Sequence, residues 1–138
     1  MKLVFPDLNV TLIDGSARKV SFLKHVIRCL GITGIAAHQI RAEQMGCDGW
    51  GRFDITLTRA LGPLEKCVQL SLPLINLKNG TIIALRGKVS QDELAQIDQV
   101  LTPYRASKRL DYHLTVRRFS LPGTNDPRTI VSVQFFAD

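Results

Sequence analysis

The chain has 138 residues, of which 45% are hydrophobic and 22% are charged. This length predicts a single domain with a core large enough to fold without metals or disulfides. The composition argues against disorder, and no apolar run approaches the length of a membrane span. The net charge of +6 favours an anionic partner, and nucleic acid is the usual one.

The cysteine pattern argues against a metal site and against a disulfide framework. The three cysteines are widely spaced, and they form neither a CxxC pair nor a Cys/His cluster with metal-ligand spacing. From this spacing we expect reduced thiols and no metal. We also expect a cytoplasmic location, because residues 1–6 are too short for a signal peptide. The cysteines are Cys29, Cys47 and Cys67.

The first predicted strand covers residues 9–14 and ends in an acid. Its apolar, β-branched run is typical of a strand buried on both faces of a parallel sheet. Asp14 would then stand at the carboxyl end of the strand, where open α/β sheets bind their ligands. A carboxylate at that place can accept both hydroxyls of a ribose. The alternative is that Asp14 only caps the helix that follows.

A basic helix and a second strand come next. Apolar residues recur at helical spacing between 17 and 30, with Ser16 available as the cap and Gly31 placed to end the helix. The opposite face of this helix carries Arg18, Lys19, Lys24 and Arg28. Residues 34–40 predict the second strand. A glycine-rich loop with Trp50 at its centre follows.

Two strand–helix pairs occupy the middle of the chain. Residues 53–58 predict a strand, and the helix after it opens at Pro63, since proline is tolerated in a first turn. Residues 81–85 predict another strand. A capping box at residues 90–93 begins the next helix, and Pro103 is expected to end it.

The end of the chain has a different pattern. Residues 110–117 alternate between apolar and polar side chains, which indicates a half-buried strand. A loop at 121–128 separates them from a last strand at 129–136, so the two strands predict an antiparallel hairpin. Alternating strands and helices before this hairpin predict an α/β fold with a mostly parallel sheet and helices on both faces.

Motifs spread along the chain resemble the GidB/RsmG methyltransferases. The resemblance covers nearly the whole chain in order, through VFPDL at 4–8, VTLID at 10–14, RAE at 41–43, TRAL at 58–61 and LRG at 85–87. It implies a class I methyltransferase sheet of the Rossmann-like kind. It also implies S-adenosylmethionine as cofactor and guanine N7 of small-subunit ribosomal RNA as the methyl acceptor.

One element of that family has no counterpart in this sequence. The family's first strand and its glycine-rich turn, which cradles the methionine end of the cofactor, precede the part that matches. We therefore expect residues 1–138 to form one methyltransferase-like domain that is incomplete relative to the family. The strands that end at Asp14 and begin at Phe53 would lose their shared neighbour, and buried unpaired backbone groups are costly. Met1–Phe5, a second copy by exchange or an N-terminal segment would complete the sheet.

The resemblance also suggests roles for individual residues. It implies Asp14 as the ribose acid, Ala42 and Glu43 as contacts on the adenine side, and Arg59 as the partner of the cofactor carboxylate or an RNA phosphate. The alternatives are a plain strand exit at 42–43 and a salt bridge at Arg59. Arg86 stands where the family has a lysine. No catalytic acid or base is expected, because guanine N7 is already nucleophilic and needs mainly alignment.

Basic residues near the end of the chain are the first candidate for an RNA surface. Tyr104, Tyr112 and His113 are interleaved with them, so phosphates and bases could both be contacted. The basic residues are Arg105, Lys108, Arg109, Arg117 and Arg118. The cationic face of the helix at 17–30 is a second candidate, and for both surfaces a merely solvated face is the alternative. The second functional hypothesis is a non-catalytic methyltransferase-like module that binds RNA or protein.

Overall fold

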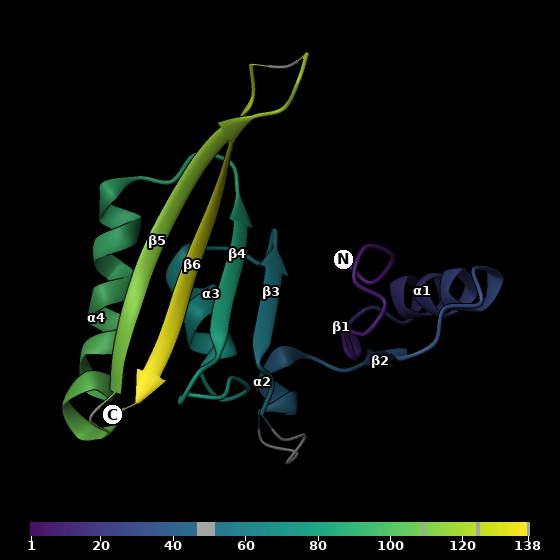
Figure 1. Cartoon of the computed structure of the whole chain (residues 1–138), viewed down its shortest axis with the longest axis horizontal. Coiled ribbons are helices and arrows are strands. Elements are labelled where there is room, and N and C mark those ends of the chain that lie inside the picture. Colours follow the sequence, from purple (N-terminus) through teal and green to yellow (C-terminus); the bar gives the residue numbers. More distant parts are fainter. Residues whose placement is uncertain (47–51, 109, 124, 138) are drawn as a thin grey trace. The chain divides into compact units, whose positions relative to one another are not determined.

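The computed structural model describes residues 1–46, 52–108, 110–123 and 125–137. The chain divides into two compact units, residues 1–49 and 50–138, and its ribbon is drawn in Figure 1. Each unit contains its own hydrogen-bonded sheet. The expectation of a single domain over 1–138 stays a prediction. Trp50 and Cys47 lie outside the described residues.

The first unit is a small βαβ arrangement. Strands β1 (Val10–Asp14) and β2 (Ile35–Gln39) are parallel, with Asp14 opposite Gln39. Helix α1 (Ala17–Cys29) connects them, and the short helix α2 (Ala42–Met45) follows β2. The buried apolar residues of this unit are Val20, Ala37 and Met45. The sequence pattern predicted both strands and α1 but not α2, because a single helical turn is too short to show a period.

The two ends of α1 are held in different ways. At the carboxyl end, the N–H of Gly31 donates to the carbonyl of Arg28 and the N–H of Ile32 donates to the carbonyl of Ile27. Gly31 has a φ of 60°, so this is the predicted glycine stop in a Schellman arrangement. At the amino end, Ser16 is the N-cap residue, but its side chain makes no capping hydrogen bond. The expected serine cap is therefore correct in position and wrong in chemistry.

The second unit contains a four-stranded mixed sheet. Its strand order is β3 (Ile55–Arg59), β4 (Thr81–Arg86), β6 (Pro127–Ala137) and β5 (Leu110–Ser120). β3 and β4 are parallel, whereas β6 is antiparallel to both β4 and β5. The α/β class and the antiparallel terminal hairpin are thus confirmed. The hairpin strands are longer than predicted and project beyond the end of β4 (Figure 1).

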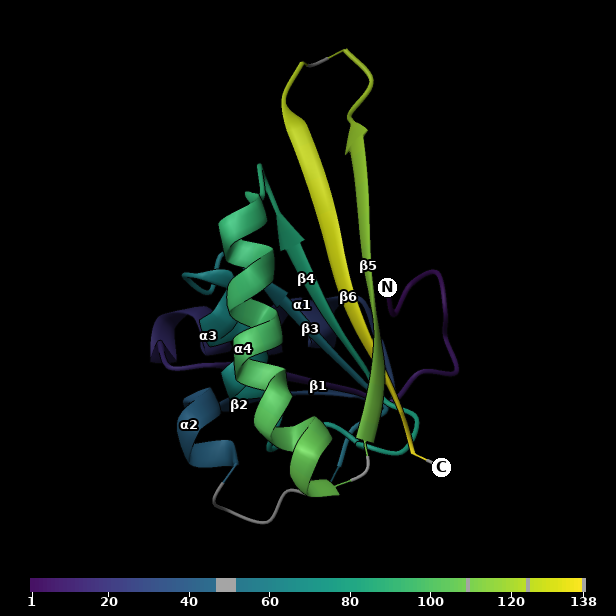
Figure 2. The same cartoon turned by 90° about the vertical axis from the view of Figure 1, so that its left-hand side faces the viewer.

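Helices α3 (Leu64–Ser71) and α4 (Gln91–Lys108) pack on one face of this sheet. Figures 1 and 2 show both helices on the same side of the strands. The core between them is apolar and almost fully buried, and its members include Leu64, Val68, Ile82, Ile97, Leu101, Val131, Val133 and Phe135. The prediction of helices on both faces does not hold for the described residues of this unit. Cys67 is buried and Cys29 is exposed, and both are free thiols.

Helix α4 does not end at Pro103, which lies inside it. Proline removes one backbone hydrogen bond and costs about 3 kcal/mol in a helix interior. Tertiary packing offsets that cost, because Leu101 is 1% exposed and Tyr104 packs against the core on the following turn. The expectation that Pro103 ends the helix is therefore wrong.

Residues 1–5 do not complete either sheet. The N–H groups of Val4 and Phe5 both donate to the carbonyl of Met1 at 2.9 Å, so the segment is a turn rather than a strand. The suggestion that Met1–Phe5 fills the place of a missing strand is wrong. Among the described residues, β1 pairs only with β2, and β3 pairs only with β4. β1 and β3 therefore each have one free edge.

Candidate cofactor and nucleic-acid site

Asp14 ends β1 with both carboxylate oxygens engaged locally. Oδ1 accepts the backbone N–H of Ser16 at 2.8 Å, and Oδ2 accepts a hydrogen bond from the Lys19 ammonium at 3.2 Å. The Ser16 N–H, followed by Lys19, holds the pKa of Asp14 below its ordinary value. The carboxylate is therefore anionic at neutral pH. This bond at the start of α1 is the capping role that was the alternative interpretation of Asp14.

The capping role leaves room for a ligand. A carboxylate has about four lone-pair directions, and the two contacts of Asp14 use one on each oxygen. Its side chain is 30% exposed, and that of Lys19 is 70% exposed. An exposed ion pair of this kind is worth little, so Lys19 can move aside at small cost. Both oxygens can then accept the two hydroxyls of a ribose.

The predicted adenine-side residues lie at the same edge of the first sheet. Because β1 and β2 are parallel and Asp14 pairs with Gln39, the loops after both strands leave at that edge. A Cβ added at Gly15 would lie 3.3 Å from Cγ of Arg41, which places the two loops in contact. Ala42 is half-buried and Glu43 is exposed at the start of α2. The structure thus brings Asp14, Ala42 and Glu43 to one edge.

In the second unit, Arg59 ends β3 and is exposed. The loop after it has an unusual backbone, with φ values of 53° at Ala60 and 100° at Gly62. A positive φ is disfavoured for alanine, so neighbouring contacts must hold this loop. The side chain of Arg59 makes no ion pair with any described residue.

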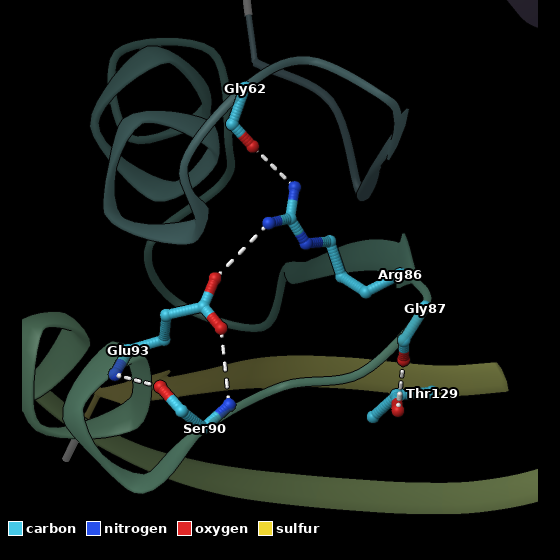
Figure 3. A network of polar contacts seen from close by, with 6 residues as sticks. All are labelled: Gly62, Arg86, Gly87, Ser90, Glu93 and Thr129. Carbon is cyan, nitrogen blue, oxygen red and sulfur yellow. Dashed lines mark hydrogen bonds and ion pairs between the residues drawn. The ribbon is translucent and has the colours of Figure 1, made fainter. Parts of the chain in front are cut away.

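Arg86 supplies the contact that holds the loop. Its guanidinium donates to the carbonyl of Gly62 and, at 3.1 Å, to Oε1 of Glu93 (Figure 3). Oε2 of Glu93 accepts the N–H of Ser90 at 3.1 Å, and Ser90 Oγ accepts the N–H of Glu93 at 3.2 Å. This is the predicted capping box. One arginine therefore joins the β3–α3 loop, the end of β4 and the first turn of α4.

The described residues among those predicted for RNA binding lie on more than one face. Arg117 and Arg118 are exposed on β5, but neighbouring residues of a strand point to opposite faces. Arg105 is on α4 and forms an exposed ion pair with Asp111 at 3.3 Å. Lys108 is the last residue of α4, and its side chain is outside what the structure describes, as is all of Arg109.

The tyrosines of that predicted surface are half-buried against the core. Tyr104 and Tyr112 pack against the main apolar cluster, and the Tyr112 hydroxyl donates to Oδ1 of Asp98 at 2.8 Å. Burial, together with Asp98, raises the pKa of Tyr112 to about 12. Packing uses part of both rings, which are half-buried, and base stacking by them stays a prediction. His113 is exposed.

An open cavity of about 510 Å³ lies at the carboxyl ends of β3 and β4. It is lined by cationic and apolar side chains, among them Arg59, Arg86, Lys88, Phe119, Arg128 and Ile130. Sequence reasoning identified Arg59 and Arg86 but missed Lys88, Phe119 and Arg128. For Phe119 and Arg128 the only signal would have been the hairpin register, which sets them opposite each other; that register gives no signal for Lys88.

Two negative findings apply to the described residues. No group of three or more His, Cys, Asp or Glu side chains could hold a metal ion. No described helix is long and apolar enough to cross a membrane.

Comparison with known proteins decides the family. The model of the GidB family, described as rRNA small subunit methyltransferase G, matches residues 1–115. The chain belongs to the GidB family. It is 32% identical over 136 residues to the ribosomal RNA small subunit methyltransferase G of Levilactobacillus brevis, covering 96% of this chain and 54% of the relative. It is also 32% identical over 133 residues to the ribosomal RNA small subunit methyltransferase G of Geobacter sp. strain M21, covering 96% of this chain and 58% of that relative.

The GidB chain thus spans about half the length of the curated relatives it matches. Solved structures agree on the fold. An rRNA methylase from Streptococcus thermophilus matches with a TM-score of 0.61 at 12% identity, over 93% of this chain and 74% of that chain. TYW2 of Pyrococcus horikoshii, solved in complex with MeSAdo, matches with a TM-score of 0.70 at 11% identity, over 99% and 52%. The fold is that of a class I methyltransferase.

Proposed function

We propose that this GidB chain is the cofactor- and RNA-binding part of an S-adenosylmethionine-dependent methyltransferase that acts on guanine N7 of small-subunit ribosomal RNA. Membership of the family supports the reaction. The observation that carries the proposal is the Asp14 carboxylate, anionic and with lone pairs to spare, at the carboxyl edge of β1 and β2. A cytoplasmic location belongs to the same proposal.

The residues present fit one end of the cofactor. Asp14 would accept the ribose hydroxyls, and the α2 start at Ala42 and Glu43 would border the adenine. The cofactor supplies an electrophilic methyl group when bound. The chain's own contribution is to hold the donor and the guanine in line and to exclude water, which is sufficient for a base nitrogen that is already nucleophilic. None of the described residues provides a glycine-rich turn for the methionine end.

A further part of the proposal is that a strand from outside the described residues pairs with the free edge of β3. Natural edge strands are usually protected by charged side chains, proline or a bulge, and β3, with the sequence ITLTR, has no proline and carries a charge only at its last residue, Arg59. Ile55 and Leu57, which lie on the same face of β3, are 44% and 45% exposed. Thr56 and Thr58 each have a buried hydroxyl without a hydrogen-bond partner among the described residues.

We propose that this strand comes from an N-terminal segment that carries the family's glycine-rich turn, rather than from a second copy. β3 and its neighbour β4 are parallel, and the missing family strand would continue that parallel pairing. Sedimentation of the purified chain tests the alternative. The proposal is supported if the chain is a monomer and binds a peptide with the sequence of the N-terminal segment that carries the glycine-rich turn. A stable dimer that does not bind this peptide contradicts it.

The cofactor site is tested by calorimetric titration with S-adenosylhomocysteine, with the 138-residue chain alone and fused to the N-terminal half of the Levilactobacillus brevis relative. We expect micromolar binding in the fused protein. Asp14→Asn should abolish this binding, because the amide no longer offers two anionic oxygens to the ribose. The amide oxygen can still accept the Ser16 N–H, so the local structure should be kept. Asp7→Asn, an exposed acid in the same unit, is the control.

Lys19→Ala makes the test sharper. The Lys19 ion pair is exposed and worth at most about 1 kcal/mol, so its loss should change cofactor affinity by less than about fivefold. Failure of the fused, folded protein to bind, or equal binding by the Asp14→Asn variant, would overturn the assignment of Asp14. Salt-sensitive RNA binding without any cofactor affinity would instead favour the non-catalytic module.

A further inference from the structure

Helix α1 carries a cationic face that neither the cofactor site nor the cavity of the second unit uses. The helix contains four basic residues, Arg18, Lys19, Lys24 and Arg28, and no Asp or Glu. An α-helix has about 3.6 residues per turn, so positions 17, 21, 24 and 28 form one stripe and positions 18, 22 and 25 form the stripe beside it. Arg18, Lys24 and Arg28 therefore share a face, whereas Lys19 points away from it.

An open groove of about 720 Å³ lies along this face, and every residue that lines it belongs to residues 1–49. Arg18, Lys24 and Arg28 line this α1 groove together with the small residues Ala17 and Ser21. The small side chains leave space between the long cationic ones, so a ligand can lie between them. The acids described in this unit do not line the groove, and they are Asp7, Asp14 and Glu43.

The cations of the α1 groove are available to a ligand. Arg18 and Lys24 are exposed and make no ion pair with any described residue. Arg28 is also exposed, and its guanidinium donates to Nδ1 of His25 at 3.2 Å, a contact that leaves its charge in place. Lys19 differs from these three because it is paired with Asp14 at 3.2 Å. Three positive charges thus stand together without a described counter-charge.

The spacing of these charges favours an extended polyanion over a single small anion. With a rise of about 1.5 Å per residue, Arg18 and Arg28 lie about 15 Å apart along the helix axis. Two arginines at that separation meet one phosphate only by folding toward each other, whereas successive phosphates of a strand can contact each of them in turn. The planar guanidinium fork also matches the geometry of a phosphate.

We propose that the α1 groove is a docking surface for the phosphate backbone of RNA, held by Arg18, Lys24 and Arg28. Contacts of this kind fix the position of a nucleic acid without reading its sequence. The surface deepens the proposed function and rests on it for the choice of RNA over another polyanion. Docking needs no bound cofactor, because Asp14 does not line the groove.

The test is fluorescence anisotropy of a labelled oligouridine mixed with the 138-residue chain at several salt concentrations. Oligouridine contains no guanine, so the methyl-acceptor base does not contribute to this binding. Arg18→Ala, Lys24→Ala and Arg28→Ala should each weaken binding by up to about fivefold, the value of one exposed ion pair. The triple variant should reduce the steepness of log affinity against log salt by about 2, since each phosphate contact on a single strand contributes about 0.7. Alanine favours helix, so circular dichroism should show these variants folded.

Two variants separate the place of the charge from the net charge. Lys19→Ala removes one positive charge from the same helix but outside the groove, and it should change affinity by less than about twofold at physiological salt. Ser21→Glu alters the net charge by the same amount and sets an acid inside the groove, so it should weaken binding at least as much as Lys24→Ala. Equal effects of Lys19→Ala and Lys24→Ala would overturn the surface.

Competition identifies the occupant. Unlabelled oligouridine should displace the probe at lower concentration than polyglutamate of equal charge, and the reverse order would indicate an acidic protein and overturn the RNA assignment. Uridine 5′-monophosphate should compete weakly, and competition equal to that of oligouridine per phosphate would contradict the extended docking.

The outcomes also separate this surface from the proposed function. Groove-dependent oligouridine binding without S-adenosylhomocysteine binding in the fused protein would retain the surface and reject the cofactor site. Cofactor binding in the fused protein, together with unchanged oligouridine binding by the folded triple variant, would reject the surface alone.

Discussion

The guanidinium of Arg86 lies 3.1 Å from the carboxylate of Glu93, and this pair joins the end of β4 to the first turn of α4. Both side chains are mostly buried, at 18% and 28% exposed. The same guanidinium reaches the carbonyl of Gly62 (Figure 3). The wall of the cationic cavity is therefore fixed by one arginine that is itself neutralised.

Replacing Arg86 should cost more stability than replacing a surface arginine. Arg86→Ala removes two hydrogen bonds and leaves Glu93 without its cation, so we expect a loss of about 1–3 kcal/mol in the free energy of unfolding. Arg105→Ala, which breaks an exposed pair with Asp111, should cost less than about 1 kcal/mol. Urea unfolding measures both.

Arg86→Lys separates charge from geometry at this position. A lysine keeps the positive charge but cannot reach Gly62 and Glu93 together through a planar fork, so its stability should lie between the wild type and Arg86→Ala. Equal losses for Arg86→Ala and Arg105→Ala would show that the network does not hold the loop.

Gly80 is predicted to tolerate no side chain. A Cβ there would lie 2.4 Å from the Asn76 carbonyl oxygen and 2.7 Å from Cγ1 of the fully buried Ile75. Gly80→Ala should lower the free energy of unfolding by about 1–3 kcal/mol, the usual cost of overpacking. Gly87→Ala, where a Cβ meets open space, should stay within about 0.5 kcal/mol of the wild type. Thermal and urea unfolding of both variants would reveal any reversal of this order.

Tyr112 makes stability depend on alkaline pH. Its pKa is raised to about 12 in the folded chain, whereas an unfolded tyrosine titrates near 10. The folded state therefore binds more protons than the unfolded state between these values, and stability is fully present below about pH 10 and lost as the pH rises toward 12. Unfolding measured across this interval should show the decline, and Tyr112→Phe should flatten it. An identical slope in that variant would assign the effect to other groups.

Arg117 and Arg118 should differ in RNA binding although they are neighbours. The strand register sets Arg117 opposite Ile130, on the sheet face that also carries Arg59, whereas Arg118 pairs with Thr129 on the other face. Arg117→Ala should weaken RNA binding and lower the salt slope by about 1, the effect of one lost phosphate contact. Fluorescence anisotropy at several salt concentrations measures this. Equal effects of the two substitutions would contradict the division by face.

Local pattern was sufficient for much of the fold. The six strands, α1, the glycine stop at Gly31 and the capping box at Ser90 could all be predicted, because each depends on side chains within a few residues. The resemblance also led to the correct family, whereas the role that it implies for Asp14 stays a prediction. The helix end at Pro103 was wrong because tertiary packing outweighs local preference. Ser16 is the N-cap residue as predicted, but its side chain makes no capping hydrogen bond.

Only the tertiary structure decided which of the basic residues share a surface. The sequence by itself determined the strand that ends in Asp14, the alternation of the hairpin and the excess of positive charge. Strand register and pairing order then placed Phe119 beside Arg128 and separated Arg117 from Arg118. Register is set by the long-range burial of one sheet face, so residues distant in the sequence, such as Arg59 and Ile130, come into line across the sheet for reasons that no short stretch of sequence contains.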